Sequence, residues 1–337
     1  MDKTIDVVGL GDLMIDFTYS GVNEDGTYNY TRNPAGSMGN VLAQVTKLGG
    51  KAVLVSTLGF DEHSRYLYET AEKLGIDMSS VRFGTWPTRF MFAYFGEGND
   101  RTFSDYRSPR NEAQTELKNV DLDKLRKSRF LDIKAIVFSP EDPIIETQNE
   151  MMRIAEENGV IPAIDMQWRG LPIPEEDKKI LVERAKLCGV VKVTNEELLY
   201  FFQAPDIESA VKKVFEESRT QIIAVTMGAC GCLLCTRTKQ IYCPTYDVSV
   251  KDTTGAGDSF MGALLFTLSR HDKPIYSLTT SDLEEIGDFC NACASFSTTK
   301  KGSMLGMASP EDADLVRKNW PKLVPEAVPA LLRRRSE

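Results

Sequence analysis

Short apolar runs alternate with amphipathic stretches along most of the chain, as in proteins whose strands alternate with helices. The first stretch, TIDVVGLGD (4–12), is an almost continuous apolar run, which is typical of a central parallel strand buried on both faces. Further strands are expected at 51–59, 135–140, 160–165, 190–195 and 222–228, and helices from Ser37, at 61–75, near 144–158, near 175–187, from Glu196 and over most of the tail from Asp282. This order predicts an α/β fold with a doubly wound, mostly parallel central sheet flanked by helices.

Residues 17–36 interrupt this alternation. Tyrosine, threonine and other strand-forming residues alternate there around the turn NEDG (23–26), a hairpin pattern with too few apolar positions for a pair of core strands. Two more strand-like stretches follow at 89–96 and 101–107. Because no internal repeat or linker divides the chain, we predict one domain over 1–337, with a small β appendage formed by about 17–34 and about 88–107.

The charge of the chain narrows the classes of partner. A net charge of −9 and a pI near 5.1 provide no basic stripe for nucleic acid or for a membrane surface. No apolar run approaches the ~20 residues that span a bilayer, and no N-terminal targeting signal is visible. We therefore expect a cytoplasmic protein, in which the seven cysteines are buried thiols.

One group of cysteines raises the question of a metal. Cys230, Cys232 and Cys235 lie close together, but a zinc site would need paired C-x-x-C knuckles. Their segment is rich in strand-forming residues, and alternate positions of a strand face opposite sides of the sheet. Structural thiols are therefore favoured over zinc ligands. Cys290 and Cys293 form a C-x-x-C on a helical pattern, without the strand and turn that a redox motif requires.

The first glycine motif fails as a nucleotide fingerprint. Gly9 and Gly11 follow a strand, but Met14 stands at the third glycine position and no helix follows, so the dinucleotide-binding pattern is incomplete. A P-loop sequence is absent as well. Asp12 and Asp16 remain as an acid pair after the first strand, where they either hold polyol hydroxyls or form a solvated acidic loop.

Two further motifs are ambiguous by themselves. Small residues around Gly36 precede a helix that contains Asn40, whose amide can both donate to and accept from a sugar hydroxyl. The same stretch also fits an ordinary helix start. The sequence TMGACG (226–231) leaves a strand through a glycine turn, which fits a nucleotide contact and an ordinary turn equally well.

The stretch KDTTGAGDSF (251–260) is more specific. Gly255, Ala256 and Gly257 precede an apolar helical stretch, so free backbone N–H groups and the helix dipole should attract an anion there. Asp258 lies in the same first turn. An acid could simply stabilise the helix start, but three small residues in a row indicate that a ligand approaches the backbone closely.

These motifs together resemble the ribokinase-like, or PfkB, carbohydrate kinases. DTTGAGD (252–258) is similar to the family motif D-T-x-G-A-G-D, and PAGSMGN (34–40) to G-G-x-x-x-N, with Ala35 at the first glycine. GFDEHS (59–64) is similar to G-x-D-x-x-G with Ser64 at the last glycine, and VTNEEL (193–198) to the fructokinase form of the N-x-x-E stretch. The sequence DMQWR (165–169), with Gln167, stands where fructokinases and 2-keto-3-deoxygluconate kinases often show D-P-N-x-R.

The resemblance implies an ATP-dependent sugar kinase and a role for each matching residue. Asp258 would be the general base and Gly255, Ala256 and Gly257 the anion hole. The remaining matches divide into sugar contacts (Asp12, Asp16, Gly36, Asn40, Arg107 and Arg169), nucleotide contacts (Thr194, Thr226, Gly228, Gly231 and Asn291) and Glu197, which would organise Mg²⁺ through water. The β appendage would be a lid over the sugar and a homodimer contact. A monovalent cation such as K⁺ is a common further requirement of the family, for which the motifs carry no signal.

Fructose is the first choice of substrate, because the glutamate stretch and TTKKGS (298–303) resemble fructokinases. 2-Keto-3-deoxygluconate is the alternative, since Arg107 and Arg169 could pair with its carboxylate. The departures at Ala35, Ser64 and Gln167 leave another sugar open. Two other functional classes are alternatives. One is a non-catalytic sugar- or nucleotide-sensing protein on the same fold. The other is a nicotinamide-dependent oxidoreductase, which rests on Gly9 and Gly11 alone.

Overall fold

A computed structural model describes residues 2–95, 101–104, 110–168 and 172–323 of the chain. The strands are β1 (Ile5–Leu10), β2 (Met14–Val22), β3 (Tyr28–Ala35), β4 (Ala52–Leu58), β5 (Asp77–Phe83), β6 (Phe90–Phe95), β7 (Arg101–Ser104), β8 (Ser128–Lys134), β9 (Ile161–Asp165), β10 (Val190–Thr194), β11 (Ile222–Thr226), β12 (Cys232–Thr236), β13 (Gln240–Cys243), β14 (Thr245–Tyr246) and β15 (Lys322–Leu323). The α-helices are α1 (Ser37–Lys47), α2 (Glu62–Lys73), α3 (Leu122–Arg126), α4 (Pro143–Glu157), α5 (Glu175–Lys186), α6 (Asn195–Phe202), α7 (Ile207–Glu217), α8 (Ala256–Arg270), α9 (Thr280–Thr298) and α10 (Pro310–Asn319).

A nine-stranded sheet forms the centre of the molecule, in the order β13-β12-β11-β10-β9-β8-β1-β4-β5. Every pairing from β11 to β5 is parallel, whereas β12 and β13 are antiparallel additions at one edge. The sheet is therefore mostly parallel, as the alternating pattern predicted. The carboxyl ends of β1, β8, β9 and β10 meet at one edge, which is where α/β sheets bind ligands.

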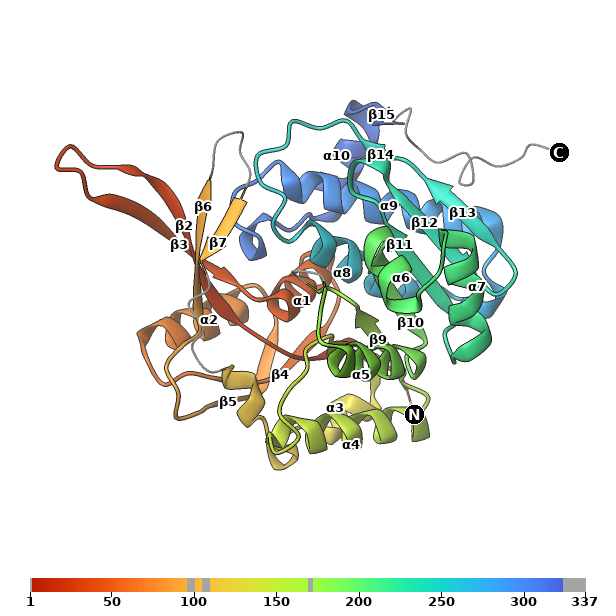
Figure 1. Cartoon of the computed structure of the whole chain (residues 1–337), viewed down its shortest axis with the longest axis horizontal. Coiled ribbons are helices and arrows are strands. Elements are labelled where there is room, and N and C mark those ends of the chain that lie inside the picture. The colour runs from red at the N-terminus through yellow and green to blue at the C-terminus, as the bar shows by residue number, and fades with distance from the viewer. Residues whose placement is uncertain (1, 96–100, 105–109, 169–171, 324–337) are drawn as a thin grey trace.

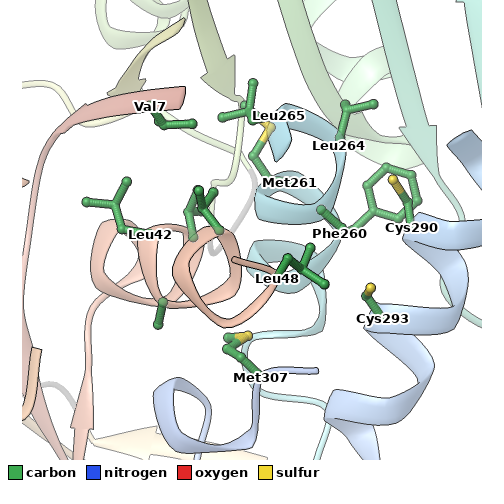
Figure 2. Close-up of a cluster of buried hydrophobic side chains, with 14 of the residues drawn as sticks. Val7, Leu42, Leu48, Phe260, Met261, Leu264, Leu265, Cys290, Cys293 and Met307 are labelled. Atoms are coloured by element: carbon green, nitrogen blue, oxygen red, sulfur yellow. The ribbon is translucent and has the colours of Figure 1, made fainter. Parts of the chain in front are cut away.

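Two buried apolar layers cover the two faces of this sheet. One layer contains α1, α8 and α9, and Figure 2 shows Leu48 beside Phe260 and Leu42 on the side toward Val7 within it. The other layer contains α4 to α7. Cys232 belongs to the first layer and Cys235 to the second, so these thiols lie on opposite faces of the sheet, as their spacing predicted.

The small β appendage is a separate four-stranded sheet in the order β3-β2-β6-β7. Its first hairpin begins at Met14, before the expected boundary, and projects away from the α/β body (Figure 1). Phe17, Tyr30 and Phe92 pack ring against ring across three of its strands. Phe17 also packs against the main core, so this aromatic cluster joins the appendage to the α/β body.

The strand expected at 135–140 is wrong, because β8 covers Ser128–Lys134 and the residues after it have no regular structure. Two charged side chains explain the error. Asp132 and Lys134 are buried in β8 and interrupt the apolar run that indicates a buried strand. Both lie toward the ligand-binding edge of the sheet. The two charged residues that made the strand difficult to predict therefore also lie close to the candidate site.

Candidate active site

The N-terminus of α8 is built from a glycine turn that only glycine fits well. Gly255 has φ +80°, and a Cβ there would lie 2.6 Å from Cβ of Ser303. Asp252 shapes the same turn by accepting a hydrogen bond from the Thr254 N–H at 2.7 Å. The Ala256 N–H donates to the Thr253 carbonyl at 3.3 Å, while the Gly257 N–H belongs to the first helical turn, which has no intrahelical acceptor. The turn thus leaves the Gly257 N–H without an intrahelical acceptor, and its role in anion binding stays a prediction.

Asp258 lies in this turn with 2% of its surface exposed. Its Oδ1 accepts a hydrogen bond from Ser37 Oγ at 2.5 Å, and its Oδ2 accepts one from Asn40 Nδ2 at 2.8 Å. Both donors are on α1, which packs against α8. The structure thus brings Asn40 and Asp258 together across more than 200 residues of sequence, and it adds Ser37, whose hydroxyl gave no signal in the sequence.

Asp12 is the second buried acid of the site. Its Oδ1 accepts a hydrogen bond from the Met38 N–H at 3.2 Å. Burial alone would raise the pKa of this carboxyl, but Lys134 and Arg89 beside it, together with the Met38 N–H, hold the pKa of Asp12 below its ordinary value. Asp12 is therefore a stable hydrogen-bond acceptor at neutral pH.

Gly36, at the N-terminus of α1, packs against the backbone of Asp12. Its φ is +111°, and a Cβ would lie 2.7 Å from the Asp12 carbonyl oxygen. Asp16 lies further along β2, half-buried and opposite Asn33 of β3. Arg107 and Arg169, the two cations expected at the far end of a substrate, lie outside the described residues.

Two lysines missed by sequence reasoning enter the site from the sheet. Lys134 of β8 donates a hydrogen bond to Ser37 Oγ, and Lys192 of β10 donates to Asp165 Oδ2 of β9 at 2.8 Å. A Cβ on Gly257 would lie 3.0 Å from Lys192 Nζ. A buried lysine in an apolar strand pattern is the signal that could have found both, because a charge is rarely buried without a partner or a function.

Two further acids have strongly shifted pKa values. Burial, with repulsion from Asp165 and Asp258, raises the pKa of Asp132 to about 7 although Lys134 and Lys192 oppose this. Burial and the charge of Asp12 raise the pKa of Glu112 to about 7. Perturbed acids of this kind gather at functional sites.

Unsatisfied buried atoms gather here as well. The described residues contain eight buried side-chain N or O atoms without a hydrogen-bond partner, and four of them belong to Asn40, Glu112, Asp132 and Asp165. Buried polar groups are usually paired. Their concentration around Asp12 and Asp258 indicates a place prepared for a polar ligand.

Glu197 lies at the start of α6, next to this cluster. Thr194 and Glu197 form a capping box, in which Glu197 Oε2 accepts from the Thr194 N–H at 3.0 Å, and Oε1 accepts from the Trp168 N–H at 2.8 Å. Each carboxylate oxygen keeps a second lone pair. Within the described ranges, no group of three or more His, Cys, Asp or Glu could hold a metal. The remaining lone pairs of the Glu197 carboxylate could accept hydrogen bonds from the water shell that Mg²⁺ retains.

The nucleotide loop expected at 226–231 follows β11. Gly228 has φ +53° and Gly231 φ +83°, and a Cβ on Gly231 would lie 2.2 Å from the Cys243 carbonyl oxygen. Asn291 of α9 donates from Nδ2 to the same carbonyl at 2.9 Å. Asn291 therefore fixes the strand that runs beside the loop, and Thr226 forms the end of β11.

Comparisons with known proteins decide the family. Residues 4–310 match the sequence model of the family described as "pfkB family carbohydrate kinase". The chain belongs to the pfkB family of carbohydrate kinases. It is an ATP-dependent sugar kinase, and the motif resemblance is confirmed.

Relatives of this carbohydrate kinase cover nearly the whole chain. A probable fructokinase-4 of Arabidopsis thaliana is 29% identical over 304 residues, which are 88% of this chain and 92% of the relative. The fold is that of a fructokinase from Xylella fastidiosa solved with bound ATP, with a TM-score of 0.82, 24% identity and coverage of 92% and 98% of the two chains. A Vibrio cholerae fructokinase double mutant, solved with fructose, ADP and a potassium ion, gives a TM-score of 0.81 at 22% identity, with coverage of 94% and 99%.

No helix in the described part of the chain is long and apolar enough to cross a membrane.

Proposed function

We propose that this kinase transfers the γ-phosphoryl group of ATP to a primary hydroxyl of fructose, with Asp258 as the general base. The observation that carries the proposal is the buried Asp258 carboxylate, held by Ser37 and Asn40 within the glycine turn of α8. A hydroxyl that displaces one of these two donors would lie against the carboxylate. Relatives named as fructokinases support the choice of sugar.

Positioning and charge stabilisation provide most of the catalysis in phosphoryl transfer. Asp258 takes the proton from the attacking hydroxyl, which contributes about 10²–10⁴ in rate. The backbone N–H groups of Gly255, Ala256 and Gly257 stabilise the negative charge that develops on the transferred group. Ala256 contributes least in the described geometry, because its N–H is already directed at the Thr253 carbonyl.

The sugar would lie between β1, α1 and the β appendage. Asp12 and Asp16 would accept hydrogen bonds from its hydroxyls, and Gly36, whose missing side chain lets its turn pack against the Asp12 backbone, would hold that acid beside the sugar. Asn40 has a carbonyl oxygen without a partner, which can accept from the same hydroxyl that Asp258 activates. Arg107 and Arg169, which lie outside the described residues, stay proposed contacts to the sugar on the ground of the motif resemblance alone.

The nucleotide would lie over the loop after β11. Thr194 and Thr226 end neighbouring strands and are register partners, so they share a face of the sheet, where they would contact the phosphates. Gly228 and Gly231 would shape the loop through their positive φ angles. Asn291 holds the wall of the adenine pocket. Mg²⁺ bound to the phosphates would neutralise their charge. Glu197 orients its water shell, and K⁺, present in the Vibrio cholerae structure, is a candidate activator.

An ADP-release assay tests the substrate. Purified enzyme is assayed with ATP and Mg²⁺, with and without K⁺, against fructose, 2-keto-3-deoxygluconate, ribose, tagatose and nucleosides. We expect the largest kcat/KM with fructose. A larger value with 2-keto-3-deoxygluconate would make that acid sugar the substrate in place of fructose. If none of the sugars gives ADP release, a non-catalytic sensing protein is favoured.

The Asp258→Asn variant tests the mechanism. We expect it to fold and bind sugar but to lose on the order of 10² or more in kcat, because an amide cannot accept the proton. Asp206→Asn is the matched control, since Asp206 caps the N-terminus of α7 away from the site. Near-native turnover of Asp258→Asn would show that Asp258 only stabilises a helix start.

We also propose a cytoplasmic homodimer joined through the β appendage. Its outer hairpin carries exposed apolar side chains, with Tyr28 at 65% and Val22 at 53% of their full exposure. These two residues are register partners at the hairpin end. A second copy that covers this surface would also fix the appendage as a lid over the sugar.

A further inference from the structure

A row of alternating charges crosses three neighbouring strands beneath the N-terminus of α8. Lys134 of β8 registers with Asp165 of β9, and Asp165 registers with Lys192 of β10. Register partners on adjacent strands point to the same face of a sheet. Both Asp165 and Lys192 are at most 3% exposed, so this is a buried ion pair rather than a surface one.

Lys192 reaches beyond its partner to the backbone of α8. A Cβ on Gly257 would lie 3.0 Å from Lys192 Nζ and 3.7 Å from Cε, so the ammonium group lies against the first helical turn. An ammonium has three donors and no acceptor. Among the described residues, its one hydrogen-bond acceptor is Asp165 Oδ2 at 2.8 Å, which leaves two N–H donors beside the turn.

This position is unfavourable for a purely structural lysine. The N-terminus of a helix carries partial positive charge and stabilises anions, not cations. A buried ion pair is also weak evidence for stability, because the cost of desolvation can exceed the attraction. Asp165 and Asp258 nevertheless hold the pKa of Lys192 above its ordinary value although burial opposes this. A cation therefore lies where the helix already attracts an anion.

We propose that Lys192 is a further catalytic residue, which donates hydrogen bonds to the phosphoryl group during its transfer to the sugar. Asp165 is its positioning residue, since the ion pair holds the ammonium against Gly257. This inference rests on the proposed phosphoryl transfer at α8. The amides of the turn supply partial charges, whereas Lys192 supplies a full charge from a buried position, where electrostatic interactions are stronger than in water.

The test compares Lys192→Met with the double variant Asp165→Asn/Lys192→Met, which does not leave a buried carboxylate without its partner. Lys178→Met is the matched control, because Lys178 is also a buried lysine, on α5, with its ammonium over the Tyr200 ring. Each protein is assayed for kcat, for the KM of fructose, for thermal unfolding, and for binding of ADP with and without aluminium fluoride in the presence of Mg²⁺ and fructose.

We expect both Lys192 variants to lose about 10²–10³ in kcat, with the KM of fructose and the affinity for ADP changed by less than about threefold. The extra affinity that aluminium fluoride gives to ADP should disappear, because that anion mimics the group in transfer. Asp165→Asn alone should lower kcat, but by less than Lys192→Met does, since it keeps the ammonium and weakens only the ion pair that positions it. Lys178→Met should behave as the native enzyme.

Two results would overturn the inference. One is turnover within about threefold of native in a folded Lys192 variant. The other is an equal loss of affinity for ADP with and without aluminium fluoride, which indicates damage to the nucleotide pocket alone. If the native enzyme itself releases no ADP with any sugar, the proposed function fails instead, and the binding measurement still reports on Lys192.

Discussion

Asp132 shows how a single residue of the site can work against the stability of the fold. It is buried in β8, its Oδ1 has no hydrogen-bond partner, and its pKa is raised to about 7. A carboxyl whose folded-state pKa is raised binds its proton more tightly in the folded protein than in the unfolded chain. Ionisation of Asp132 therefore opposes folding at neutral pH.

The sign of this effect can be measured with Asp132→Asn. The native free energy of unfolding should fall as pH rises from about 4 to about 7, as the folded protein is forced to release this proton. Asparagine has no proton to lose, so the stability of Asp132→Asn relative to native should increase by about 2–3 kcal/mol between pH 5 and pH 8. Denaturant unfolding at both pH values measures it.

The exposed Asp272→Asn variant is the control for a change of net charge. A stability difference between Asp132→Asn and native that is the same at both pH values would show that the carboxyl does not titrate in this range.

At the scale of elements, the sequence predicted those motifs whose residues are contiguous in the chain. The glycine turn before α8 and the strand-to-helix step at Thr194 are contiguous in sequence, so their function can be inferred from neighbouring residues. β8 was misplaced because Asp132 and Lys134 interrupt its apolar run.

Contacts between distant elements could not be predicted in this way. Ser37 and Lys134 meet only because α1 packs over the end of β8, and Lys192 reaches Gly257 only because β10 ends beneath α8. Single positions on separate elements carry no shared pattern. Tertiary structure is therefore needed to find them.

The glycine turn allows a matched test of its geometry. Alanine at Gly255 must adopt φ +80° and meet Cβ of Ser303 at 2.6 Å, whereas alanine at Gly159 adopts φ +63° with nothing within 4 Å. Gly159→Ala should cost about 1 kcal/mol of unfolding free energy from backbone strain alone. Gly255→Ala should cost about 1–3 kcal/mol more from the steric contact.

Chemical denaturation gives both values, and kcat gives the functional effect of Gly255→Ala. Equal losses of stability in the two variants would mean that Ser303 moves freely out of the way, and that the turn has room for a side chain.

At the scale of the whole molecule, the two sheets carry different parts of the candidate function. The large sheet holds Asp258 and the buried charges at its carboxyl edge, with core layers on both faces. The small sheet is separate from the large one: Ile15 and Phe17 at its base contact the first core layer, and its outer hairpin extends into solvent (Figure 1). The composition of residues 17–36 predicted this separation, because a hairpin with few apolar residues cannot bury both of its faces.

The exposed end of that hairpin provides the test of the proposed dimer. Tyr28 and Val22 are register partners there, and both are more than half exposed. Exposed apolar groups that cluster are often covered by a partner. We therefore expect the native enzyme to be a dimer by analytical ultracentrifugation, and the Val22→Glu/Tyr28→Glu variant to be a monomer, because two buried carboxylates without partners would oppose association.

Tyr276→Glu is the control for this experiment, since Tyr276 is 74% exposed on a separate surface segment and its variant should remain a dimer. If the hairpin also closes over the sugar, the monomeric variant should show a raised KM for fructose with the affinity for ADP unchanged, because the nucleotide contacts lie on the large sheet. A native enzyme that is a monomer, or a double variant that still dimerises, would show that this surface is not a dimer interface. The appendage would then be proposed as a lid alone.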